Sequence, residues 1–152
     1  MICLRDTAFE PTEAMREFER AASGAGAIVS FTGLVRETGT QGKVSTLHLQ
    51  AYSPMTERGI RSAAEEAERR WPLTALSIVH RIGNMSPGEP IVFVATASAH
   101  RRAAFEAADF LMDYLKTEAV FWKKEVTEQG SEWIEPKPQD YSDRNRWSGT
   151  GD

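Results

Sequence analysis

The order of apolar and polar residues predicts a chain in which strands and helices alternate. Across residues 44–52, leucine and alanine side chains alternate with mostly polar ones, which is the period-two pattern of a half-buried strand. Across residues 54–71, apolar side chains recur at intervals of three and four, while glutamate and arginine fill the opposite face. A half-buried strand is therefore expected to lead directly into a long amphipathic helix.

The remaining segments are assigned in the same way. Two further helices are expected at residues 11–23 and 102–117. The apolar stripe of the second of these is expected to consist of Phe105, Ala108, Met112 and Leu115. Content rich in β-branched, aromatic or other apolar residues predicts strands at residues 27–35, 73–82, 91–99, 121–126 and 132–135.

Turn residues indicate how these strands are joined. A polar loop that contains glycine separates strands 27–35 and 44–52, and we expect these two strands to pair antiparallel. Strands 73–82 and 91–99 are apolar enough to be central in a sheet. The segment 127–130 contains a glycine and is expected to close a β-hairpin near the end of the chain.

The element order indicates an α+β fold with a mixed or antiparallel sheet and packed helices. At 152 residues with 41% hydrophobic side chains, the chain can bury one sizeable core. We therefore expect a single domain over residues 1–135. Residues 136–152 are polar and contain prolines, so they are expected to form a tail that is poorly ordered by itself.

Composition restricts the classes of protein to consider. The apolar runs are short, no leader follows Met1, and the single cysteine, Cys3, excludes a multi-cysteine metal site. We expect a cytoplasmic protein with no membrane span, bound metal or cofactor. The net charge of −4 argues against general nucleic-acid binding, which needs many phosphate contacts from lysine and arginine.

Positive charge nevertheless gathers at the ends of predicted elements, where binding sites are usually built. His100 and Arg101 stand directly before a helix, whose free N–H groups and dipole favour an anion. Ordinary solvated arginines beside a helix start are an equally good interpretation. The helix dipole alone would also explain Lys116 near the end of that helix.

A more specific hypothesis concerns the lysines. In a strand, Lys123 and Lys124 point to opposite faces, so one of them is expected to face inward. If Lys116 and Lys123 shared a pocket with Arg36, repulsion and partial burial would lower a lysine pKa and supply a neutral amine. The chain has no nucleophile elbow, Walker loop, HExxH motif or dinucleotide fingerprint that would indicate another chemistry.

Several segments together resemble one known family, that of the molybdopterin synthase catalytic subunit, over most of the chain from about residue 27 to 147. They are 29–36 (VSFTGLVR), 52–57 (YSPMTE), 69–73 (RRWPL), 80–83 (HRIG), 87–89 (PGE), 98–101 (SAHR), 105–107 (FEA), 112–117 (MDYLKT) and 121–125 (FWKKE). Their order and spacing make the resemblance specific.

The resemblance implies an α/β hammerhead-type fold and a heterotetramer. Two copies of the large subunit would form a central homodimer, with a small ubiquitin-like sulfur carrier ending in Gly-Gly at each end. The carrier's C-terminal thiocarboxylate would deliver sulfur to cyclic pyranopterin monophosphate, giving the dithiolene of molybdopterin.

The resemblance also implies residue roles. Lys116 and Lys123 match the family's catalytic lysines, whose expected task is proton transfer and stabilisation of the leaving carboxylate. The positions matching substrate-binding residues or adjacent pocket wall are Leu34, Val35, Arg36, His100, Arg101, Lys124, Glu125 and Lys137. At the last of these the family typically has an arginine from the neighbouring large subunit, and a lysine cannot make the same bidentate phosphate contact.

Two other functions are compatible with parts of the pattern. A noncatalytic phosphate- or nucleotide-binding module would use the same arginines and helix start, and the lysines distinguish it from a sulfurtransferase. An RNA-binding domain using tryptophan and arginine would require steeply salt-dependent affinity, which the acidic composition disfavours.

Overall fold

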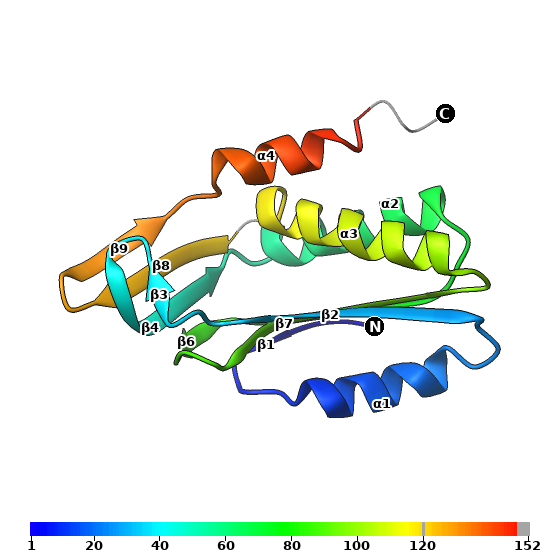
Figure 1. Ribbon diagram of the computed structural model, residues 1–152, viewed down its shortest axis with the longest axis horizontal. Helices are drawn as coiled ribbons and strands as arrows, with labels where there is room; N and C mark the ends of the chain where they lie inside the picture. The colour runs from blue at the N-terminus through cyan, green and yellow to red at the C-terminus, as the bar shows by residue number, and fades with distance from the viewer. Residues whose placement is uncertain (120, 149–152) are drawn as a thin grey trace.

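The computed structural model describes residues 1–119 and 121–148, and within them the chain folds into two sheets and four helices (Figure 1). The elements in chain order are β1 (Ile2–Arg5), α1 (Pro11–Ala21), β2 (Ala27–Leu34), β3 (Thr38–Gly39), β4 (Gly42–Ala51), α2 (Met55–Arg70), β5 (Leu73–Arg81), β6 (Gly83–Met85), β7 (Pro90–Ser98), α3 (Arg101–Thr117), β8 (Phe121–Thr127), β9 (Gly130–Ile134) and α4 (Pro138–Asn145).

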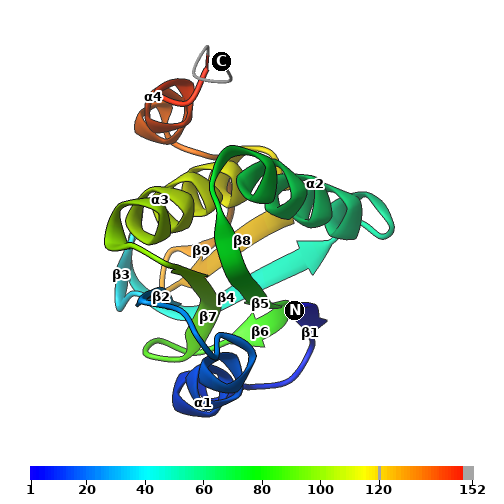
Figure 2. The ribbon, with the colours of Figure 1, turned by 90° about the vertical axis from the view of Figure 1, so that its right-hand side faces the viewer.

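The first sheet has the strand order β1-β5-β7-β2. β1 pairs parallel with β5, and the other pairs are antiparallel. Figure 2 shows α1 on one face of this sheet and α2 with α3 on the other. β5 and β7 are therefore the central strands, as their apolar content predicts, because each is flanked by strands on both sides and covered on both faces.

The second sheet has the order β3-β4-β8-β9, with the short β6 also paired to β4. β8 and β9 form the predicted antiparallel hairpin. This sheet lies at one end of the molecule, beside the C-terminal end of α3 (Figure 1). The mixed α+β class expected from the element order is confirmed.

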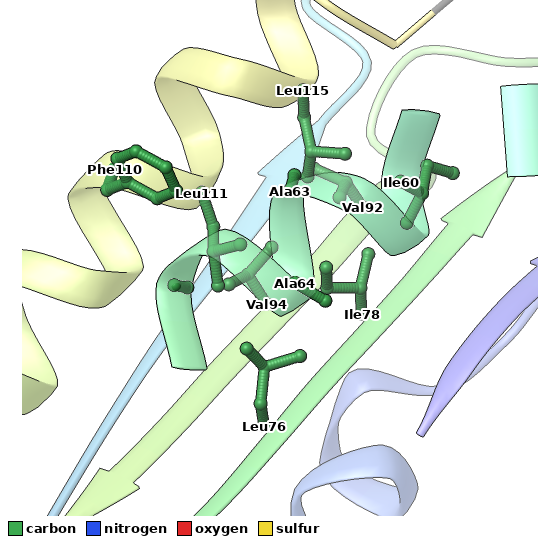
Figure 3. Packing of buried hydrophobic residues seen from close by; sticks show 11 residues of the cluster. Ile60, Ala63, Ala64, Leu76, Ile78, Val92, Val94, Phe110, Leu111 and Leu115 are labelled. Carbon is green, nitrogen blue, oxygen red and sulfur yellow. The ribbon is translucent and has the colours of Figure 1, made fainter. Parts of the chain in front are cut away.

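The main core lies between α2, α3 and the first sheet (Figure 3). α2 contributes Ile60 and small alanines, which let it approach α3 closely. α3 contributes Phe110 and Leu111, which are fully buried. A second cluster, centred on Phe18 and Phe93, packs α1 against the opposite face. Helices therefore pack against both faces of the first sheet. None of the described helices combines the length and apolar character needed to span a bilayer.

The expected pairing of the strands at 27–35 and 44–52 is wrong. β2 pairs with β7, for example Ala27 opposite Ser98, while β4 pairs with β8 in the other sheet. The segment between β2 and β4, including the short β3, carries the chain from one sheet to the other. Strands that follow one another in sequence pair or neighbour only about two-thirds of the time, and periodicity does not identify the exceptions.

The predicted apolar stripe of α3 is also partly wrong. Phe105 is 59% exposed, whereas Ala104, Ala107 and Leu111 are buried. Two overlapping stripes of apolar residues run along this helix. The buried stripe faces β7 and α2, and it is offset from the predicted stripe that contains Phe105. A helix rich in apolar residues allows both choices, so only its packing partners decide between them.

The polar tail contains α4, which the sequence does not predict. Just after this helix, Trp147 Nε1 donates to Asp113 Oδ2 at 2.6 Å and Arg146 Nη2 to the same oxygen at 2.7 Å. The Trp147 ring also packs edge-on against Phe110 and Trp71. Contacts with α3 therefore hold the described part of a segment that has little apolar content of its own.

Candidate active site

A pocket of about 660 Å³ lies where the end of β2, the second sheet and the C-terminal end of α3 meet. Part of its wall is apolar, with contributions from β4, β7, α3 and β8. These apolar side chains include Leu47, Leu49, Ile91, Met112, Leu115 and Phe121. The volume suits a small organic ligand, and an apolar wall with a few polar groups is the usual lining of such a site.

Four cationic side chains line this pocket. Arg36 follows β2, Lys116 stands in the last turn of α3, Lys123 lies in β8, and Lys137 precedes α4. The fold thus brings together basic residues that are up to about a hundred positions apart in the chain. On a protein of net charge −4, such a concentration of positive charge favours an anionic ligand at this place.

The alternation of β8 decides which lysine faces inward. Lys123 lines the pocket, while Lys124 and Trp122 lie on the outer face, where Lys124 Nζ is 5.4 Å from the centroid of the Trp133 ring. Burial lowers the pKa of the Lys123 amine, and the charges of Lys116, Arg36 and Lys137 lower it further, against the opposing effect of Glu125. The neutral amine is therefore accessible at lower pH than for an ordinary lysine.

Glu125 is the buried carboxylate of the pocket. Its Oε1 lies 3.4 Å from both the backbone nitrogen and the hydroxyl of Thr40. A Cβ at Gly39 would lie 2.6 Å from the Glu125 carboxylate oxygens, so a larger residue there would displace this carboxylate. The short β3 segment therefore covers Glu125, whose negative charge partly offsets the four cations.

Backbone contacts set the position of Arg36. The preceding residue, Val35, donates its N–H to the carbonyl oxygen of Glu89 at 2.9 Å. The Glu89 carboxylate accepts from the Ser86 N–H at 2.6 Å, which lowers its pKa, and forms an ion pair with Arg81 at 3.4 Å. The turn after β6 is thus held in place, and it in turn anchors the end of β2 that presents Arg36.

Three of the residues expected at the site do not line the pocket of the same chain. The Lys124 side chain is on the outer face, and His100 and Arg101 are at the N-terminal end of α3. Lys116 is sixteen positions after His100, which corresponds to roughly 24 Å along a helix axis. Leu34, Val35 and Glu125 do line the pocket. Lys137 also lines the pocket, and it does so in its own chain, whereas the resemblance implies a contribution to the site of the neighbouring large subunit.

His80 also lines the pocket, and sequence reasoning does not identify it as a site residue. It stands near the end of β5, where its ring stacks on Phe121 with centroids 4.2 Å apart. Burial lowers the pKa of His80 to about 4; the bond to the Arg81 carbonyl opposes this shift, and the charge of Lys116 adds to it. Its sequence signals are a histidine at the end of a mostly apolar strand, which more often marks a core residue, and its place in the segment 80–83 (HRIG), to which the resemblance attaches no role.

The arrangement can bind an anion and supply an amine for proton transfer. Within residues 1–119 and 121–148, no three His, Cys, Asp or Glu side chains are grouped so that they could hold a metal ion. The groups that line the pocket and can take part in chemistry are its lysines, Arg36, the neutral imidazole of His80 and the carboxylates beside them.

Comparison with known proteins identifies relatives over nearly the whole chain. A family model described as MoaE protein matches residues 4–118. A molybdopterin synthase catalytic subunit from Pseudomonas aeruginosa is 47% identical over 146 residues, covering 96% of this chain and 97% of the relative. The solved structure of a molybdopterin biosynthesis MoaE protein from Burkholderia ambifaria superimposes with a TM-score of 0.82 at 38% identity, covering 97% of each chain.

A more distant structure has the same fold. It is a protein–protein complex of subunits 1 and 2 of molybdopterin-converting factor from Helicobacter pylori, with a TM-score of 0.74 and 18% identity. The match covers 91% of this chain and 91% of that one. At this level of identity, the likeness concerns the fold alone.

Proposed function

Because the chain belongs to the MoaE protein family, the family of the molybdopterin synthase catalytic subunit, we propose that it transfers sulfur to cyclic pyranopterin monophosphate from a carrier protein. The chain is an enzyme of molybdopterin biosynthesis, the route to the molybdenum cofactor. The proposed donor is the C-terminal thiocarboxylate of a small ubiquitin-like subunit ending in Gly-Gly. The single cysteine supports the cytoplasm as the proposed compartment.

The observation that carries this proposal is the grouping of Arg36, Lys116, Lys123 and Lys137 around one partly apolar pocket. Both reactants are anions, since the substrate has a phosphate and the carrier ends in a thiocarboxylate. Four cations would offset their mutual repulsion, while the apolar wall would accept the uncharged ring system. A pocket built only to bind phosphate would not require a half-buried lysine of lowered pKa.

We assign the lysines different tasks on the basis of their surroundings. In the net reaction, each transfer exchanges one sulfur for one oxygen. A carbon–oxygen bond of the substrate is replaced by a carbon–sulfur bond, and the carbon–sulfur bond of the carrier is replaced by a carbon–oxygen bond, with water able to take up and supply the exchanged oxygen, so that the carrier leaves as a carboxylate. Lys123, whose pKa is lowered, is the better candidate for proton transfer. Lys116 is exposed at the mouth of the pocket and would stabilise negative charge on the departing carboxylate.

Reconstitution tests the proposal directly. The purified chain, mixed with cyclic pyranopterin monophosphate and a carrier bearing a C-terminal thiocarboxylate, is expected to form the dithiolene product, measured by chromatography of its oxidised fluorescent derivative. The same carrier with an ordinary carboxylate is the control and should give none. Substrate binding without product would support the noncatalytic phosphate-binding module and exclude sulfur transfer.

We also propose a homodimer in which the partner subunit completes the site. Within one chain, His100 and Arg101 are too far from Lys116 to contact the same small substrate. β2 is an edge strand on which Ile28, Phe31 and Leu34 are exposed, a surface suited to a second copy of the chain. Antiparallel pairing of the two β2 edges would bring the partner's α3 start near Arg36.

Complementation between inactive variants tests this arrangement. Lys116→Ala and Arg101→Ala homodimers are each expected to be nearly inactive. Mixing and refolding them together should restore about a quarter of the wild-type activity per site, because half of the dimers are then mixed and each mixed dimer has one intact site. Activity that stays at the level of the separate variants would mean that both residues serve the same chain.

A further inference from the structure

We propose that His80 is a substrate-contacting residue whose Nε2 accepts a hydrogen bond from an N–H group of the substrate's ring system and so orients the ring. This inference takes the identity of the substrate from the proposed function. In this proposal His80 recognises the uncharged ring of the ligand, whereas the cationic side chains recognise its negative charge.

The hydrogen bonding of His80 determines its tautomer. Nδ1 lies 2.9 Å from the carbonyl oxygen of Arg81, and a carbonyl oxygen only accepts, so Nδ1 holds the proton. In the neutral ring, Nε2 then has the free lone pair. Among the described residues, Nε2 has no hydrogen-bond partner, and it is not among the side-chain atoms that are both fully enclosed and unpaired. Because His80 lines the pocket, this lone pair is available to a ligand there.

The surroundings keep the ring both neutral and fixed. His80 is buried, and stacking on Phe121 at an interplanar angle of 18° restricts rotation of the ring. Burial lowers the pKa of His80 to about 4, and the nearby charge of Lys116 contributes to the lowering because it disfavours a second positive charge. At neutral pH the side chain is therefore a preorganised acceptor, and preorganisation reduces the entropy lost on binding.

His80 places a buried, neutral acceptor beside the cations of the pocket. Arg36, Lys116 and Lys123 can only donate in their charged forms, whereas a pterin ring presents N–H and amino donors. Glu125 can accept, but its negative charge would repel the substrate's phosphate. His80 can accept without repelling it, so it can select for a ring with a donor at the matching position.

Three variants separate the functions of the side chain. His80→Phe keeps an aromatic ring to stack on Phe121 but has no nitrogen. His80→Asn can still donate to the Arg81 carbonyl but lacks the distal acceptor. His80→Gln reaches as far as Nε2 and retains an acceptor. If the acceptor matters, the first two variants should weaken binding and the third should not.

The measurement is direct binding by titration calorimetry at neutral pH, with no carrier present, so that its outcome does not depend on sulfur transfer. The dissociation constant of cyclic pyranopterin monophosphate is expected to rise about three- to ten-fold in His80→Phe and His80→Asn, and less than about two-fold in His80→Gln. Inorganic phosphate, which lacks the ring, should bind all variants as it binds the wild type. Thermal unfolding of each variant verifies that the folded protein is being titrated.

Two results would overturn the inference. Unchanged substrate affinity in folded His80→Phe and His80→Asn would make His80 a packing residue only. An equal loss of affinity for inorganic phosphate would mean that His80 acts through Lys116 and does not contact the ring. If the wild type formed no product in the reconstitution but these binding differences were still observed, the proposed sulfur transfer would be wrong and the role of His80 in binding would stand.

Discussion

Replacing Lys116 by alanine is expected to lower the rate of product formation by about 10²- to 10⁴-fold, the usual contribution of a positioned proton-transfer or charge-stabilising group. The side chain is exposed at the mouth of the pocket, so its removal leaves no cavity. Only the favourable interaction of a cation with the end of α3 is lost, which is about 0.3–1 kcal/mol of stability. Activity should therefore fall far more than the free energy of unfolding.

Single-turnover kinetics with the thiocarboxylated carrier measure this loss, and urea unfolding measures the stability. Lys43→Ala is the matched control, because Lys43 is an exposed lysine on β4 that does not line the pocket. It should retain the wild-type rate. Lys116→Arg keeps the charge but cannot release a proton at neutral pH, so substantial activity in this variant would assign charge stabilisation to Lys116. Turnover that persists in Lys116→Ala would contradict the catalytic assignment.

Replacing Phe110 by alanine is expected to reduce the free energy of unfolding by about 3–5 kcal/mol. Phe110 is completely buried on α3, with its ring 5.2 Å from Trp71 and 4.3 Å from Tyr114, measured between centroids. It also supports Trp147, whose ring lies 5.7 Å away. Truncation would therefore leave a cavity and remove one of the contacts that hold the segment after α4.

Phe105→Ala is the control for this prediction, since the same residue type on the same helix is 59% exposed. Its effect on the free energy of unfolding should stay within about 0.5 kcal/mol, as for most surface substitutions. Urea denaturation monitored by circular dichroism gives both values. Similar losses in the two variants would mean that α3 packs with a different face than the structure has.

Local periodicity is sufficient for much of the fold. The alternation at β4 and the three-and-four spacing in α2 depend only on neighbouring residues, and the structure has both elements near the predicted bounds. The alternation of side chains along β8 likewise predicts correctly that Lys123 and Lys124 face opposite sides of the strand. The length of α3 also implies from sequence alone that His100 and Lys116 are far apart, because rise per residue is a property of the helix.

Contacts between distant segments could not be obtained in this way. The pairing of β2 with β7, the buried face of α3 and the ordering of the segment after α4 depend on which surfaces meet. Periodicity describes a surface without identifying its partner. His80 is the clearest case at the site, since a histidine ending an apolar strand is unremarkable until Phe121 and Lys116 are placed around it.

The sequence by itself determined most of the longer helices and strands, with α4 as an exception, and that one lysine of β8 faces inward. Through the resemblance it also indicated the candidate residues of the site. Only the tertiary structure decided that Arg36, Lys116, Lys123 and Lys137 surround one pocket. The physical reason is that charge interaction and desolvation depend on distances through space. A lysine acquires a lowered pKa only when folding buries it and brings other cations beside it.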